Sequence, residues 1–137
     1  MPDDLLHDLT AIAAARRRQF REQMASAGFP WHLNAAGDVL AHVPAGGISQ
    51  AELTQSMGLS KQAVQQLLDQ LEAAGVVRRE PDHADRRARR IVLSDLGLRD
   101  IATQQQVLDQ FEALARDRLG RKRLDKFRKA LKKLGAL

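Results

Sequence analysis

A short turn between two amphipathic helices, followed at once by an arginine-rich hairpin pattern, predicts a mainly α fold of the winged helix-turn-helix class. Apolar residues also recur at helical spacing toward both ends of the 137-residue chain. We therefore expect an N-terminal dimerisation helix at residues 1–30 and a three-helix core with a β-hairpin wing at 31–95. The C-terminal dimerisation helices should occupy residues 96–137.

Composition narrows the classes of protein that fit this sequence. The formal net charge is +5, there is no cysteine, and 44% of the residues are hydrophobic. The absence of cysteine excludes disulfides, thiolate zinc sites and cysteine-based redox sensing. No apolar run approaches the ~18 residues of a membrane-spanning helix, and the acidic N-terminus is unlike an export signal. We expect a cytoplasmic protein with no membrane partner, and the basic balance favours a polyanion.

The N-terminal third predicts one long helix and one short one. Over residues 3–27 the apolar positions recur at helical spacing, namely Leu5, Leu9, Ile12, Phe20 and Met24. Gly28 and Pro30 then break the helix. Asn34 can cap a short helix that reaches about Val43.

The two central helices have clear boundary signals. Ser49 and Glu52 form a capping box, and the helix that they begin should end at Gly58. Ser60 can cap a second helix that ends at Gly75. The apolar side of this second helix carries Val64, Leu67, Leu68 and Leu71. Two helices joined by a short turn containing glycine are typical of a helix-turn-helix.

Residues 76–93 have the pattern of a hairpin. Strand-like residues lie on either side of turn-forming residues at 81–85. The loop carries four arginines, Arg86, Arg87, Arg89 and Arg90, which would repel one another without a polyanion nearby. A narrow A·T minor groove attracts arginine strongly. We expect the Asp85 carboxylate to hold the Arg87 guanidinium in a charge-assisted pair; a solvated charged loop is the alternative.

The polar side of the second central helix predicts contacts with base edges. Its outward residues are expected to be Lys61, Gln62, Gln65, Gln66 and Asp69. Glutamine offers a donor and an acceptor side by side, which suits an adenine edge, and lysine suits guanine or phosphate. Ser60 and the backbone N–H groups at the helix start suit phosphate. The alternative is an ordinary solvated helix face.

The two ends of the chain predict a second copy as partner. Ser94 begins a further long helix, and after Gly120 a last basic helix follows. The terminal apolar stripes consist of Leu5, Leu9 and Ile12 at one end and of Leu124, Phe127, Leu131 and Leu134 at the other. A domain of about fifty residues cannot cover both stripes, so a two-fold homodimer is the economical solution. Packing of the two stripes within a monomer is the alternative.

Six stretches between residues 48 and 97 together match one known pattern. They are Ile48–Leu53, Leu59–Val64, Leu67–Leu71, Gly75–Arg79, Asp85–Arg87 and Val92–Gly97. The most specific part is Asp-x-Arg in the wing, followed by a strand and a Leu-Ser-x-x-Gly helix start. This combination resembles the MarR family of winged-helix regulators. The resemblance implies an intertwined homodimer with recognition helices in the major groove and wings in the flanking minor groove, and many members are ligand-responsive repressors.

The resemblance also implies which residues contact double-stranded DNA. By position these are Ser60, Lys61, Gln62, Gln65 and Gln66 on the helix, with Asp85 and Arg87 in the wing. The arginine-rich hairpin adds Arg86 and Arg89. Members often carry arginine where this chain has Gln66 or Gln70, so base preference does not transfer. Trp31 and His32 lie near the place where the resemblance implies an effector pocket, but we expect core or hinge packing as their role and keep the pocket as the alternative.

No other chemistry stands out in the sequence. The four histidines His7, His32, His42 and His83 lack metal-ligand spacing, and no catalytic constellation is present. We expect no enzyme, cofactor or metal. The prediction is a sequence-specific transcription regulator that binds a pseudo-palindromic operator. We expect it to act as a repressor, with a small-molecule effector as a further candidate partner. The alternatives are a non-specific architectural DNA-binding protein and a winged helix used for protein contact.

Overall fold

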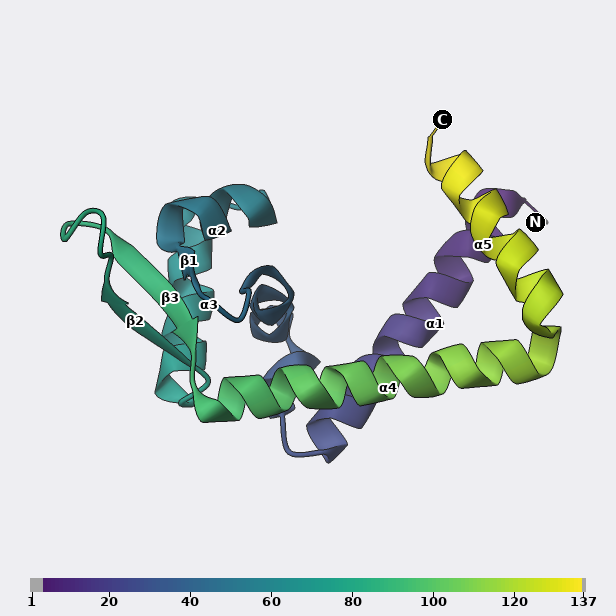
Figure 1. Ribbon diagram of the computed structural model, residues 1–137, viewed down its shortest axis with the longest axis horizontal. Helices are drawn as coiled ribbons and strands as arrows, with labels where there is room; N and C mark the ends of the chain where they lie inside the picture. Colours follow the sequence, from purple (N-terminus) through teal and green to yellow (C-terminus); the bar gives the residue numbers. More distant parts are fainter. Residues whose placement is uncertain (1–3, 137) are drawn as a thin grey trace. The chain divides into compact units, whose positions relative to one another are not determined.

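The computed structural model describes residues 4–136 and is mostly helical, with one small antiparallel sheet (Figure 1). The elements in chain order are α1 (Leu5–Ser26), η1 (Pro30–Leu33), η2 (Ala35–His42), β1 (Ile48–Ser49), α2 (Gln50–Met57), α3 (Lys61–Ala73), β2 (Val77–Pro81), β3 (Arg89–Leu93), α4 (Asp95–Leu119) and α5 (Arg121–Gly135). The predicted fold class is confirmed. None of the helices described within 4–136 has the length and apolar character needed to cross a lipid bilayer.

The chain divides into two compact units, and the division falls inside α4. The first unit runs to Gln104 and the second begins at Gln105. The first unit therefore contains α1, the winged-helix elements and the beginning of α4. The second contains the rest of α4 and all of α5.

The N-terminal third contains the expected long helix and a different short one. Asp4 caps α1, since its Oδ1 accepts the His7 N–H at 2.7 Å; the predicted start at Asp3 lies outside the described residues. The segment capped by Asn34 is η2, a 3-10 helix, and the Asn34 side chain accepts the Ala36 N–H at 2.8 Å. The cap was predicted correctly, whereas the tighter helix type was not foreseen.

The helix-turn-helix has the predicted boundaries. The hydroxyl of Ser49 accepts the Glu52 N–H, and that of Ser60 accepts the Ala63 N–H, each at 3.1 Å. Gly58 ends α2 with a φ of +66°, a left-handed conformation that glycine adopts without steric cost. These caps satisfy N–H groups that have no partner within their own helices.

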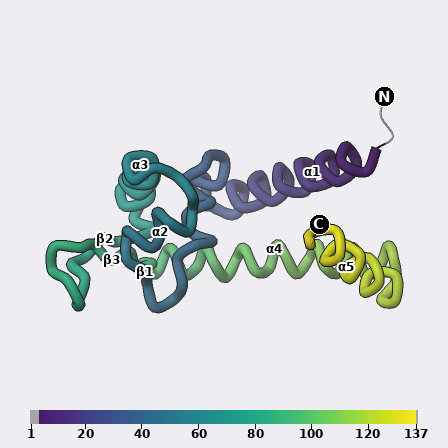
Figure 2. The backbone as a smooth tube through the Cα atoms, turned by 90° about the horizontal axis from the view of Figure 1, so that it is seen from above, coloured from purple at the N-terminus to yellow at the C-terminus, as the bar shows by residue number. Residues whose placement is uncertain are grey.

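The sheet contains the expected hairpin and one further short strand. β2 pairs with β3 from Val77 opposite Leu93 to Pro81 opposite Arg89. β1 pairs with the other edge of β3, so the strand order is β1-β3-β2. Two views show the hairpin loop projecting away from α2 and α3 (Figures 1 and 2). β1 was missed because two residues show no period-2 pattern.

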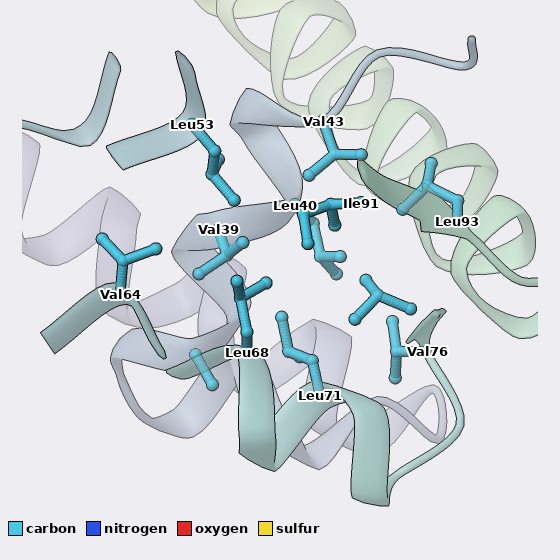
Figure 3. Close-up of a cluster of buried hydrophobic side chains, with 12 residues drawn as sticks. Val39, Leu40, Val43, Leu53, Val64, Leu68, Leu71, Val76, Ile91 and Leu93 are labelled. Carbon is cyan, nitrogen blue, oxygen red and sulfur yellow. The ribbon is translucent and has the colours of Figure 1, made fainter. Parts of the chain in front are cut away.

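A single apolar core holds the winged helix together (Figure 3). Its most deeply buried side chains come from η2, α2, α3, both hairpin strands and the residue before β2, and they include Val39, Leu40, Leu53, Val64, Leu68, Leu71, Val76, Val77 and Ile91. Each such side chain contributes roughly 1.5–3 kcal/mol by leaving water. Leu67, also predicted for this face, is only partly buried.

The start of α4 is fixed closely to the hairpin. The Ser94 hydroxyl accepts the Gly97 N–H at 3.2 Å and also lies 2.9 Å from the Val76 carbonyl oxygen, to which it can donate. A Cβ at Gly97 would collide with that same carbonyl. Glycine at this position therefore lets the helix approach the strand backbone.

Candidate nucleic-acid interface

The outward face of α3 carries the predicted recognition residues. Lys61, Gln62, Gln65 and Gln66 are all exposed, whereas Val64, Leu68 and Leu71 on the opposite side have no exposed surface. The glutamines therefore do not pack against the core of their own chain. Their amides are available to groups outside the molecule.

The beginning of α3 adds donors suited to a phosphate. Ser60 is exposed and its oxygen already accepts the Ala63 N–H, which leaves its hydroxyl proton free to donate. The first N–H groups of a helix have no internal partner and lie at the positive end of the helix dipole. This end of α3 therefore favours an anion.

The wing loop is organised by short-range hydrogen bonds. The Asp82 N–H donates to the Ala88 carbonyl at 3.0 Å, which closes the loop. An Asp85 carboxylate oxygen accepts the backbone N–H of Arg87 at 3.0 Å. Asp85 thus bonds to the backbone of Arg87, and not to its guanidinium as predicted. An N–H two residues away costs less entropy to reach than the end of a long side chain.

Three of the four loop arginines project freely. Arg86, Arg87 and Arg89 are exposed, and within residues 4–136 their guanidinium groups have no hydrogen-bond or ion-pair partner. Arg90 differs, because its Nη2 donates to the Gly46 carbonyl at 2.6 Å. The cationic tip thus consists of Arg86 and Arg87, on a loop whose backbone is fixed by Asp82 and Asp85, and of Arg89 at the first position of β3.

One ion-pair cluster joins α3 to the wing. Arg79 of β2 places Nη2 2.5 Å from an Asp69 oxygen and 2.9 Å from Glu72 Oε1. The hydrogen bond from Arg79 lowers the pKa of the Glu72 carboxyl, and that same bond raises the pKa of Arg79. Asp69, expected to face outward with the glutamines, is therefore engaged by a strand residue. Nothing in the spacing of the sequence indicated this pairing.

A second polar cluster is buried at the junction of η1 with α4. Asp100 is completely buried and accepts from Trp31 Nε1 at 2.7 Å and from Gln104 Nε2 at 2.7 Å. His32 Nε2 lies 2.9 Å from the same carboxylate, and the Phe20 ring meets the His32 ring edge-on. Trp31 and His32 therefore hold the start of α4 against η1 through Asp100. This is the packing role that we expected for them in place of an effector pocket.

The apolar stripes of the terminal helices remain uncovered. Leu5 and Ile12 of α1 are 58% and 56% exposed, and Phe127 and Leu131 of α5 are 50% and 38% exposed. Leu134 is also exposed, whereas Leu9 and Leu124 are partly covered. Large apolar side chains aligned along a helix favour a protein partner.

Comparison with known proteins matches this geometry. Residues 34–88 match the model of the MarR family. The chain is similar to a transcriptional regulator from Thermotoga maritima, with 27% identity, 95% of this chain and 90% of that chain covered, and a TM-score of 0.66. No curated protein matches the chain.

Two structures from E. coli extend the likeness over almost the whole chain. The reduced form of MarR is 20% identical, covers 98% of both chains and has a TM-score of 0.79. A MarR variant complexed with operator DNA is 20% identical, covers 95% of this chain and 92% of that chain, and has a TM-score of 0.70. At these identities the likeness concerns the fold.

Proposed function

We propose that this winged helix-turn-helix chain, whose residues 34–88 match the model of the MarR family, is a repressor that binds a pseudo-palindromic DNA operator as a homodimer. The family is one of transcription regulators rather than enzymes. Repression would be steric, since a dimer lying across a promoter excludes other proteins from it.

One observation carries the proposal. The same helix buries Val64, Leu68 and Leu71 completely and leaves Gln62, Gln65 and Gln66 exposed. Amide side chains on one exposed helical face match the hydrogen-bonding edges presented in the major groove. The free guanidinium groups at the wing tip suit the flanking minor groove or its phosphates.

The dimeric part of the proposal is supported by the exposed stripes of α1 and α5. A second copy would bury Leu5, Ile12, Phe127 and Leu131, and two-fold symmetry would duplicate the reading surface. Two recognition helices on one face of a duplex contact half-sites about one helical turn, ~10 bp, apart. The operator complex of the E. coli variant supports extending DNA binding to this chain.

The proposal also includes a small-molecule effector. A shallow hollow lies over α1 and η1 and is lined by Ala14, Arg17, Arg18, Arg21, Glu22 and Leu33. Arginines beside an apolar side chain favour an anionic compound with an apolar body. A compound of this kind that weakens operator binding and protects the hollow from chemical labelling would support the assignment.

Selection of bound sequences from a random duplex pool tests the central proposal. We expect an inverted repeat whose half-sites lie about 10 bp apart. Equal affinity for selected and scrambled duplexes would favour the architectural alternative. No binding to either duplex at low salt would favour a protein-interaction module.

A further inference from the structure

Arg79 joins the base of the wing to the recognition helix α3. Among the wing arginines in residues 4–136, it is the one whose side chain bonds to that helix. The Arg79 side chain is 16% exposed, and its Nη2 lies within hydrogen-bond distance of both Asp69 and Glu72. Glu72 also accepts the backbone N–H of Arg79 at 3.1 Å. One carboxylate therefore holds both the backbone and the side chain of the same strand residue.

The cluster lies where it controls the angle of the hairpin. Arg79 is paired with Ile91 across the hairpin, two residues before β2 ends at Pro81. At ~3.3 Å per residue, the loop tip lies on the order of 12 Å beyond Arg79, so a tilt of about 10° moves the tip by roughly 2 Å. Such a shift exceeds the tolerance of a hydrogen bond.

The partners of Arg79 belong to the helix that carries the reading surface. Asp69 lies one helical turn after Gln65, and Glu72 lies one turn beyond Leu68. The hydrogen bonds from Arg79 therefore link the strand that leads to the loop arginines with the helix that carries the glutamines. The single positive charge of Arg79 also offsets part of the negative charge of two carboxylates on the helix proposed to face phosphates.

We propose that Arg79 is a positioning residue for sequence recognition: bound to Asp69 and Glu72, it fixes the wing relative to α3 without contacting DNA itself. The inference rests on the proposed function and deepens it. Arg79 acts through geometry, so that the loop arginines and the glutamines meet one duplex at the same time. Its charge alone does not account for this role.

The test compares affinity for a duplex selected from a random pool with affinity for a scrambled duplex of equal length and composition. Arg79→Ala should lower the selected-over-scrambled ratio by roughly tenfold, comparable to one lost base-pair contact. Arg78→Ala is the matched control, because Arg78 is an exposed neighbour of equal charge. We expect this control to keep the parent ratio.

A double variant separates geometry from charge. Asp69→Asn with Glu72→Gln removes two negative charges, so its affinity for scrambled DNA should rise. If Arg79 acts by geometry, the ratio should nevertheless fall. Arg79→Lys keeps the charge but replaces the planar guanidinium, whose Nη2 contacts both carboxylates, by a flexible ammonium, and should lower the ratio less than Arg79→Ala does. Circular-dichroism melting of each variant confirms that it is folded.

The outcomes distinguish the two proposals. A parent protein that binds both duplexes equally overturns the proposed function and this inference with it. A parent that discriminates, with an unchanged ratio in Arg79→Ala and in the double variant, overturns the role of Arg79 alone. An equal fall of the selected-over-scrambled ratio in Arg78→Ala would assign the fall to lost charge, and would overturn the positioning role of Arg79.

Discussion

α3 and α5 have similar apolar stripes but opposite surroundings. Val64, Leu68 and Leu71 of α3 have no exposed surface, whereas Phe127 and Leu131 of α5 are 50% and 38% exposed. Both stripes follow helical spacing, so periodicity alone does not separate them. The comparison teaches that an apolar stripe shows that a helix needs a partner surface, while only the fold shows whether the same chain supplies it.

The largest expected effect is on the α3 stripe. Leu68→Ala removes a completely buried side chain next to Leu40 and Leu71, and should lower the free energy of unfolding by about 2–5 kcal/mol. Urea denaturation followed by circular dichroism measures this change. Leu131→Ala in α5 lies in the proposed dimer interface, so it is measured in a Phe127→Asp background, which should be monomeric, and there it should lower the free energy of unfolding far less. Equal losses in the two variants would remove the contrast.

The next effect concerns the α5 stripe. Phe127→Asp places a charge on the exposed apolar face and should convert the proposed dimer to a folded monomer at micromolar concentration. Light scattering gives the mass, and circular dichroism checks that helix content is retained. Loss of the second recognition helix should also weaken operator binding, because binding of the two half-sites is no longer linked. A parent protein of monomeric mass would contradict the proposed interface.

A smaller effect is expected on the polar side of α3. Gln65→Ala should leave stability unchanged, since the side chain is exposed, and should relax base preference at particular positions by roughly 1–3 kcal/mol. Competition binding with single-base variants of the selected duplex measures the change. Preference that is unaltered at every position would exclude Gln65 from base reading, and Gln66→Ala provides the parallel measurement.

The smallest effect is expected at the wing tip. Arg87→Ala removes one free guanidinium and should reduce the slope of log affinity against log salt by about 1. Because a phosphate contact carries no sequence information, selected and scrambled duplexes should weaken together. A salt series with both duplexes tests this, and an unchanged slope would exclude Arg87 from contact with the backbone.

Local signals accounted for most of the fold and for the exposed polar side of α3. Ser49, Ser60 and Asn34 were predicted as caps because a side-chain oxygen bonds to an N–H only two or three residues away. The exposed glutamine face followed from the spacing of the leucines on α3. The hairpin followed from its turn residues and strand pattern.

Contacts between distant residues were not predictable in this way. Trp31 and Asp100 are 69 positions apart, and no pattern in the sequence indicates that a buried carboxylate joins them. The buried Asp100 is tolerated because three side chains donate to it, and no buried side-chain polar atom among residues 4–136 lacks a partner. The β1 pairing was missed for the same reason, since Ile48 pairs with Ile91. The Arg79 cluster spans only seven to ten positions, but it joins a helix to a strand across a turn, and no periodic pattern describes such a contact.

The sequence by itself determined where helices begin and end, which side of α3 is apolar, and that the hairpin loop is cationic, since these depend on bonds and spacings within a few residues. Only the tertiary structure decided that α3 buries its stripe and α5 does not, that Arg90 turns to Gly46 and that Arg79 binds α3. The physical reason is that these contacts join different elements, some of them far apart in the chain, and exist only after the core has packed those elements together.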